Sequence, residues 1–171
     1  MRVRDHIAVS TGSAALLSPW LGGDAIGMWA GGVLVDADHY AWFCLTKRRG
    51  SAKAAMRFFN EAHPPQHAAT RVLHTPSALI VALLASLRWP RLRSTALGMT
   101  LHLALDLAHD ARMNRARTVA LARDDSRCRH CGTRSGSIEA HIARQPSLLP
   151  SYRSHNLISL CGACHEAAHG G

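Results

Sequence analysis

Cysteine and histidine carry most of the chemistry that this chain of 171 residues offers, with 5 of the first and 12 of the second. Four cysteines form two pairs with two residues between the partners, Cys128 with Cys131 and Cys161 with Cys164, whereas Cys44 stands apart. Thiolates at this spacing are typical of a tetrahedral zinc site, and the chain has no clear secretory leader that would favour oxidation. The sequence therefore predicts a structural Zn²⁺ on the paired cysteines rather than disulfide bonds.

Polar residues typical of metal-dependent nucleases are interleaved with these cysteines. In chain order they are His141, Asn156, His165 and His169. This order and spacing resembles the HNH endonuclease family, in its four-cysteine zinc-stapled form, over residues 119–171. The resemblance implies a ββα-metal fold in which His141 activates water as general base and Asn156 holds the loop and orients that imidazole. It also implies that His165 and His169 bind a catalytic divalent ion (Mg²⁺, Mn²⁺, Ni²⁺ or Zn²⁺), which stabilises charge on the scissile phosphate.

The chain departs from the HNH pattern at one position. Many members have Asp or His, a further metal ligand, directly before the general base, and this chain has Ala140 there. The segment Glu139-Ala140-His141-Ile142 can instead be aligned so that His141 is a ligand and Ile142 stands at the base position. Either alignment leaves one role unfilled, and a zinc ribbon without catalysis is the alternative interpretation of the segment.

A second group of histidines and aspartates lies in the first 118 residues. His102 and Asp106 are four residues apart in an apolar segment, so they share one face of a predicted helix. Burying such a face is costly unless the polar groups pair or bind metal. Asp36, Asp38 and His39 directly follow another apolar run, as ligands do when they stand at the end of an element. These patterns indicate a second metal site.

With His6 and the segment Arg71-x2-His74-Thr75-Pro76-Ser77, these motifs resemble a helical family of membrane-bound metal-dependent hydrolases over residues 3–112. The chain differs from that family in having Val35 where members have proline before the first aspartate. The resemblance implies one or two metal ions that activate water for hydrolysis inside a helical bundle. The ligands that it implies are His6, Asp36, Asp38, His39, His74, His102 and Asp106.

The fold class follows from the composition of the chain and from the prolines and glycines that interrupt its apolar segments. A hydrophobic fraction of 47% excludes a disordered chain, and no run of about 18 uninterrupted apolar residues suggests a spanning helix. We therefore expect a mainly α protein, with an N-terminal helical bundle at residues 1–118 and a small zinc-stapled ββα-metal (HNH) module at 119–171. Prolines and glycines divide the bundle into about five helices, at Pro19, Gly22–Gly23, Gly31–Gly32, Pro64–Pro65 and Pro90.

The charge of the chain predicts a polyanionic partner. The formal net charge is +9, and residues 1–118 hold 14 Lys and Arg against 7 Asp and Glu. Arg112, Arg115 and Arg117 lie in a polar connector that we expect to be helical and to contact phosphates of DNA, although a solvated linker has the same composition. We expect a cytoplasmic protein, with peripheral membrane contact as the alternative.

Three functions are consistent with these patterns. The first is an HNH-type endonuclease that hydrolyses phosphodiester bonds in DNA. The second is a membrane-associated metal-dependent hydrolase that acts on phosphoester or lipid-like substrates through the N-terminal histidines and aspartates. The third is a non-catalytic, zinc-containing adaptor that binds DNA or a membrane. The number of metal ions bound and the residues that hold them distinguish the three.

Overall fold

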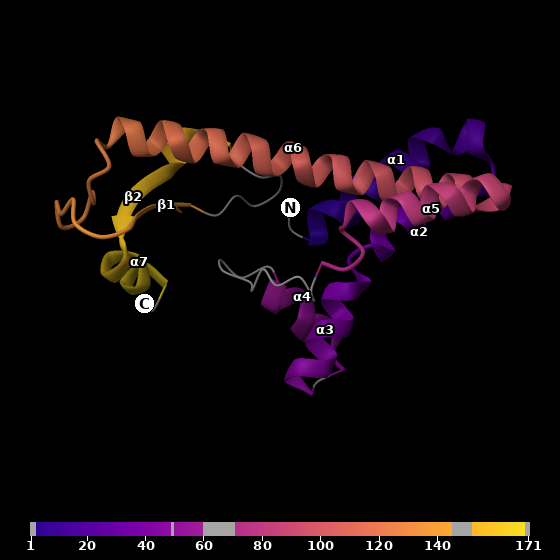
Figure 1. The fold of residues 1–171 in the computed structure, drawn as a ribbon, viewed down its shortest axis with the longest axis horizontal. Helices are drawn as coiled ribbons and strands as arrows, with labels where there is room; N and C mark the ends of the chain where they lie inside the picture. The colour runs from indigo at the N-terminus through magenta and orange to yellow at the C-terminus, as the bar shows by residue number, and fades with distance from the viewer. Residues whose placement is uncertain (1–2, 49, 60–70, 145–151, 170–171) are drawn as a thin grey trace. The chain divides into compact units, whose positions relative to one another are not determined.

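The structure, a computed structural model, describes residues 3–48, 50–59, 71–144 and 152–169 and confirms a mainly α fold with a small two-stranded sheet (Figure 1). The chain forms two compact units, Met1–Asp106 and Leu107–Gly171, here called the helical unit and the C-terminal unit. The elements in order are α1 (Val3–Leu21), α2 (Asp24–Leu34), α3 (Ala37–Lys47), α4 (Ala52–Phe59), α5 (Pro76–Arg88), η2 (Pro90–Leu92), α6 (Arg93–Arg123), β1 (Ile138–Ile142), η3 (Ser154–Asn156), β2 (Leu157–Cys161) and α7 (Gly162–His169).

The described residues contain six α-helices ahead of β1, against about five predicted, and two of the predicted breaks, Pro19 and Gly31–Gly32, lie inside helices. Pro19 lies in the last turn of α1, where its ring leaves the carbonyl of Ala15 without the usual amide donor. The Ser18 hydroxyl donates to that carbonyl over 2.8 Å. Pro64 and Pro65 lie outside the described residues.

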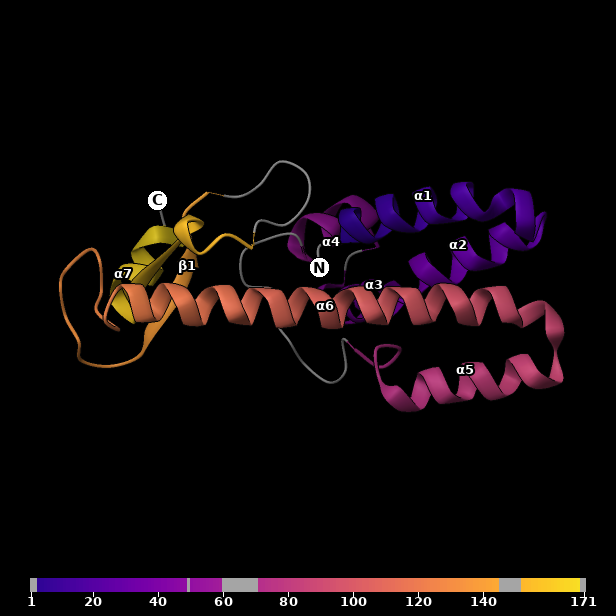
Figure 2. The same cartoon turned by 90° about the horizontal axis from the view of Figure 1, so that it is seen from above.

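Two glycines let helices α2 and α6 pack with their backbones in contact. A Cβ added to Gly31 would collide with the carbonyl of Thr95, and one added to Gly98 would collide with the carbonyl of Met28. Gly31 therefore continues α2 and serves packing rather than ending the helix, contrary to the prediction from sequence. In Figure 2 the first part of α6 is seen between α2 and α5.

One apolar cluster of the helical unit lies between α3 and α4, where Phe43, Ala55 and Phe59 are buried. Several of the unit's other buried residues are polar, among them His6, His102 and Asp106. Among the described residues, no helix is both long and apolar enough to cross a membrane. The buried polar groups must therefore find partners within the unit itself.

The C-terminal unit is a hairpin packed on the end of α6 and followed by α7. Strands β1 and β2 are antiparallel, with Glu139 opposite Leu160 and His141 opposite Ile158. Ala140 packs against the buried cluster of Ala116, Ala120 and Leu157. Because side chains alternate along a strand, Glu139 and His141 point to the other face of the hairpin.

Asp124, just after α6, ties this helix to β2. Its carboxylate accepts the backbone N–H of Ser159 at 3.2 Å and two bonds from the Arg123 guanidinium at 2.8 and 2.6 Å. The hydrogen bonds from Arg123 lower the pKa of Asp124 to about 2, against the opposing effect of burial, and the bond from Ser159 lowers it further. The ionised carboxylate thus contributes stability above pH about 4 that is lost as the pH falls toward 2.

We expect Asp124→Asn to lower the free energy of unfolding of the C-terminal unit by about 1–2 kcal/mol at pH 7, because the guanidinium and the Ser159 amide lose an ionised acceptor. The difference from wild type should shrink as the pH falls from about 4 toward 2, because the carboxylate is protonated near pH 4 in the unfolded chain and near pH 2 in the folded one. Denaturant unfolding at a series of pH values measures both. A difference that stays constant down to pH 2.5 would contradict the assigned role.

Candidate metal centres

The four paired cysteines converge, as the spacing predicts. The sulfur atoms of all four lie within 4.8 Å of one another. Those of Cys131 and Cys161 are 3.7 Å apart. The four residues are Cys128, Cys131, Cys161 and Cys164. The first pair lies in a tight loop, in which the N–H of Cys131 points to the Cys128 sulfur at 3.5 Å. Gly132 follows at φ +77°, a conformation that favours glycine. The four cysteines are close enough to bind a metal such as zinc.

The environment of the thiols also suits a metal. Backbone N–H groups, first that of Cys131 and then those of Cys161 and His130, lower the pKa of the Cys128 thiol to about 5. Hydrogen bonding to the Cys161 sulfur first, then burial, hydrogen bonding to Cys128 and Cys131 and the repulsion from Cys128, raise the pKa of the Cys164 thiol to about 12. A divalent cation would remove that repulsion.

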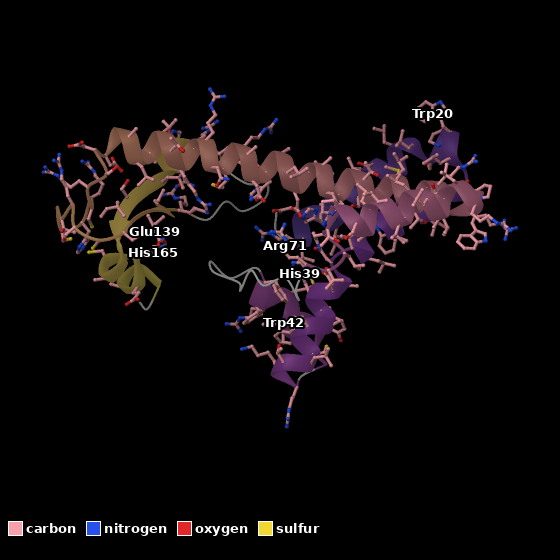
Figure 3. All side chains as sticks on the ribbon, in the orientation of Figure 1. Trp20, His39, Trp42, Arg71, Glu139 and His165 are labelled. Carbon is pink, nitrogen blue, oxygen red and sulfur yellow. The ribbon has the colours of Figure 1, made fainter. Side chains whose placement is uncertain are left out.

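The C-terminal unit also brings His141 and His165 together. His141 extends from β1 and His165 from α7, and their rings are 5.1 Å apart between centroids in a T-shaped arrangement. Glu139 completes a group on this face, since its Oε2 lies 3.4 Å from Nδ1 of His165 (Figure 3). The side chain of His169 lies outside the described residues.

Glu139 was not among the site residues predicted from sequence. The signal that could have found it is strand alternation, because Glu139 and His141 are two residues apart and share a face. Ala140 lies on the opposite face against the core, and a longer polar side chain there would point away from His165. The neighbour of His141 that faces His165 is therefore Glu139.

Asn156 holds the segment that follows β1 through hydrogen bonds. Its side-chain amide donates to the carbonyl of Arg144 at 2.8 Å, and its Oδ1 accepts the N–H of Arg144 at 3.2 Å. The carbonyl of Asn156 also accepts the N–H of Ala143 at 2.9 Å. An amide carries both a donor and an acceptor, which explains why asparagine suits this position.

In the helical unit, six of the seven predicted ligands form three overlapping groups of three. Within each group, one ligand atom of every residue lies within 4.8 Å of the others. The side chains of His74 and His102 are almost fully buried, and their Nε2 atoms are 3.1 Å apart. The groups are His6 with Asp36 and His102, Asp36 with His39 and His74, and His74 with His102 and Asp106.

Two carboxylates flank this pair of imidazoles. Oδ1 of Asp36 lies 3.3 Å from His74 Nε2 and 3.7 Å from His102 Nε2. Oδ2 of Asp106 lies 3.8 Å from His74 Nε2 and 3.7 Å from His102 Nε2. The other oxygen of Asp106 is 3.0 Å from Nε2 of His6, whose ring stacks on that of His102. Imidazole nitrogens and carboxylate oxygens are common ligands of divalent transition metals.

The outer hydrogen bonds orient the two central imidazoles. Nδ1 of His102 donates to the carbonyl of Gly32 over 2.8 Å, and Nδ1 of His74 lies 3.3 Å from Oδ2 of Asp38. Both bonds leave Nε2 facing the cluster, as in metal-bound histidines. Asp38 lies outside the three groups, and its oxygens accept from Nδ1 of His39 at 2.6 Å and the N–H of Leu73 at 2.9 Å.

The charges of the cluster show an incompletely neutralised site. Burial opposes ionisation of Asp36, but the hydrogen bond from His74 and the nearby His102 outweigh it and hold the pKa of Asp36 below its usual value. Burial lowers the pKa of His74, but the bonds to Asp36 and Asp38 raise it to about 9. Oδ2 of Asp36 and Nδ1 of His6 are buried without a hydrogen-bond partner. These unsatisfied atoms fit a cluster built to hold a cation.

The three predicted DNA-contacting arginines are exposed on α6. Arg112 and Arg115 are one turn apart and share a face, whereas Arg117 lies on another side of the helix. The guanidinium of Arg112 lies 5.7 Å from the centre of the Tyr152 ring, and that of Arg117 donates to Asn114 at 3.4 Å. All three remain accessible to phosphate.

The chain matches no family model, and no curated protein or solved structure matches it either.

Proposed function

We propose that the chain is a metal-dependent endonuclease of the HNH type that hydrolyses phosphodiester bonds in DNA, with its chemistry in the C-terminal unit. The observation that carries the proposal is a hairpin followed by a helix in which His141 and His165 face each other, with ring centroids 5.1 Å apart. Asn156 forms a hydrogen bond with Arg144 in the segment that follows β1. The four cysteines converge beside the same hairpin and helix, since Cys161 ends β2 and Cys164 lies on α7. These contacts support the proposal, because the HNH resemblance assigns roles to the same residues.

Each polar residue then has a definite task. His141 accepts a proton from the attacking water, and Asn156 holds the segment after β1 through Arg144. His165, with His169 on the same helix, holds the divalent ion. When bound, that ion supplies stabilisation of the charge that develops on the scissile phosphate and its leaving oxygen. The exposed Arg112, Arg115 and Arg117 supply affinity for the DNA backbone that does not depend on sequence.

Glu139 takes the ligand position that Ala140 leaves unfilled. Its carboxylate already lies 3.4 Å from the His165 imidazole, and a carboxylate together with imidazoles is a common ligand set for the ions in question. Glu139 is also exposed, so it can turn toward an ion without breaking a buried contact.

We expect Glu139→Gln to raise the metal concentration needed for half-maximal cleavage by about 10-fold or more, because a neutral amide binds cations weakly. Cleavage measured across a titration of Mn²⁺ or Mg²⁺ gives this value. Glu166→Gln is the matched control, since Glu166 is an exposed glutamate on α7 next to His165. Equal metal requirements for Glu139→Gln and wild type would remove Glu139 from the ligand set.

The proposed activity is tested with supercoiled plasmid. Wild-type protein should nick it in the presence of Mg²⁺, Mn²⁺, Ni²⁺ or Zn²⁺ and not with chelator. The variant His39→Ala shows which unit carries the activity, because His39 belongs to the cluster of the helical unit. Retained nicking by this variant supports the C-terminal site. No cleavage by wild type under any of the four metals contradicts the proposal and leaves the hydrolase of the helical unit and the non-catalytic adaptor as the remaining functions.

A second candidate function is a metal-dependent hydrolase of phosphoester or lipid-like substrates, with its chemistry in the helical unit. The observation that favours it is the convergence of six histidines and aspartates from α1, α3, α6 and the segments before α3 and α5. A model phosphodiester such as bis-p-nitrophenyl phosphate tests this candidate. Turnover lost in His39→Ala and retained in His141→Ala supports it, and the reverse pattern contradicts it.

A further inference from the structure

The cluster in the helical unit offers more ligand atoms than one ion can use. Six side chains contribute to the three overlapping groups, and divalent transition metals in such sites take four to six ligands, some of them water. The groups also diverge, because His6 and His39 belong to different groups and no group contains both. A single ion at the His74–His102 pair would leave one or both of these imidazoles unused.

Asp36 is the residue that links the groups. Asp36, His74 and His102 each belong to two of the three groups, and Asp36 is the member shared by the group that holds His6 and the group that holds His39. Its Oδ1 faces the Nε2 atoms of His74 and His102 at 3.3 and 3.7 Å, whereas its buried Oδ2 has no hydrogen-bond partner. A carboxylate can bind one cation through each oxygen. An imidazole whose Nδ1 is engaged by another group binds only one.

We propose that the helical unit binds a pair of divalent ions bridged by the carboxylate of Asp36. The first ion lies at Oδ1 with His74, His102 and Asp106. The second lies at Oδ2, where His39 or His6 is its other protein ligand, and it keeps open positions for water or substrate. The inference rests on the second candidate function, that the cluster holds metal. Two ions about 3.5–4 Å apart suit the oxygens of a phosphate ester.

The residues that bond to the outer nitrogens of the imidazoles support two ion positions. Asp38 engages Nδ1 of both His39 and His74, so one carboxylate orients an imidazole of each predicted ion. The carbonyl of Gly32 does the same for His102. Asp38 is therefore a positioning residue rather than a ligand. Replacement of Asp38 should weaken the binding of both ions. It should not remove the spin coupling between two bound Mn²⁺ ions, because Asp36 still bridges them.

Electron paramagnetic resonance of bound Mn²⁺ tests the pair directly. The full chain is first loaded with one equivalent of Zn²⁺, which the thiolates prefer, and then titrated with Mn²⁺. We expect a multiline signal from two spin-coupled Mn²⁺ ions, together with an uncoupled signal from the C-terminal unit. In His165→Ala the uncoupled signal should fall while the coupled one remains. Asp36→Asn should lose the coupled signal, and Asp110→Asn, an exposed aspartate on α6, should keep it.

The outcomes separate the inference from the function on which it rests. An uncoupled Mn²⁺ ion that is lost in His102→Ala would show a single-ion site, which overturns the bridging role and leaves the second candidate intact. No Mn²⁺ bound outside the C-terminal unit would overturn both. The wild-type spectrum alone decides whether a coupled pair is present, and the His102→Ala and His165→Ala variants separate the other two results. The conclusion therefore does not depend on whether Asp36→Asn folds.

Discussion

His141→Ala is expected to lower the rate of metal-dependent plasmid cleavage by about 10²- to 10⁴-fold, the usual effect of removing a general base. His141 lies on β1 with its ring facing His165, and Asn156 fixes the chain immediately after the strand. Alanine is well tolerated at a partly buried strand position, so the loss should come from chemistry rather than from unfolding. Single-turnover cleavage at saturating metal and DNA measures it.

His165→Ala is expected to differ from His141→Ala in its dependence on metal. His165 is assigned to the ion, so its loss should raise the metal requirement, whereas the loss of His141 should leave that requirement unchanged. His155→Ala is the matched control, since His155 is an exposed histidine in the same unit. If His141→Ala cleaved as fast as this control, the general base would have to be another group, and Ile142 cannot serve.

The local patterns in the sequence predicted those parts of both centres that depend on spacing within one element. The two Cys-x2-Cys pairs converge, and His102 and Asp106 share a buried face of α6 because four residues make about one helical turn. The stretch after α2 likewise presents Asp36 and His39 to the cluster. Such features follow from helix geometry and from the cost of burying unpaired polar groups.

Features that depend on contacts between distant segments could not be predicted in this way. Gly31 continues a helix because its neighbour is the backbone of α6, a contact that no local pattern encodes. Asp38 is a predicted ligand, and the sequence could not show that its oxygens contact His39, His74 and the backbone of Leu73. Which histidine pairs with which carboxylate is decided by packing across the unit, and only the folded chain shows it.

Cys161→Ser is expected to unfold the hairpin and α7, because a zinc ion held by the four cysteines would supply most of the stability of this unit. The apolar cluster between α6 and the hairpin is small, with Ala116, Ala120 and Leu157 buried and two partly buried neighbours. A structural zinc site contributes on the order of 10 kcal/mol to the folding free energy of small metal-bound units. The loss of one thiolate ligand removes a large part of this stabilisation. The variant should bind less than one zinc per chain and lose plasmid cleavage, since Cys161 ends β2 directly before α7.

Cys44→Ser is the matched control, because Cys44 lies on α3 in the helical unit, away from the other four cysteines in the sequence. Zinc content and amide NMR spectra of both variants measure the effect. The signals of residues 138–142 and 157–168 should collapse in Cys161→Ser alone, while those of α2 and α3 persist. If the hairpin signals survived with zinc absent, the small core would be sufficient by itself, and the cysteines would have to be explained by redox chemistry or by a transient ion.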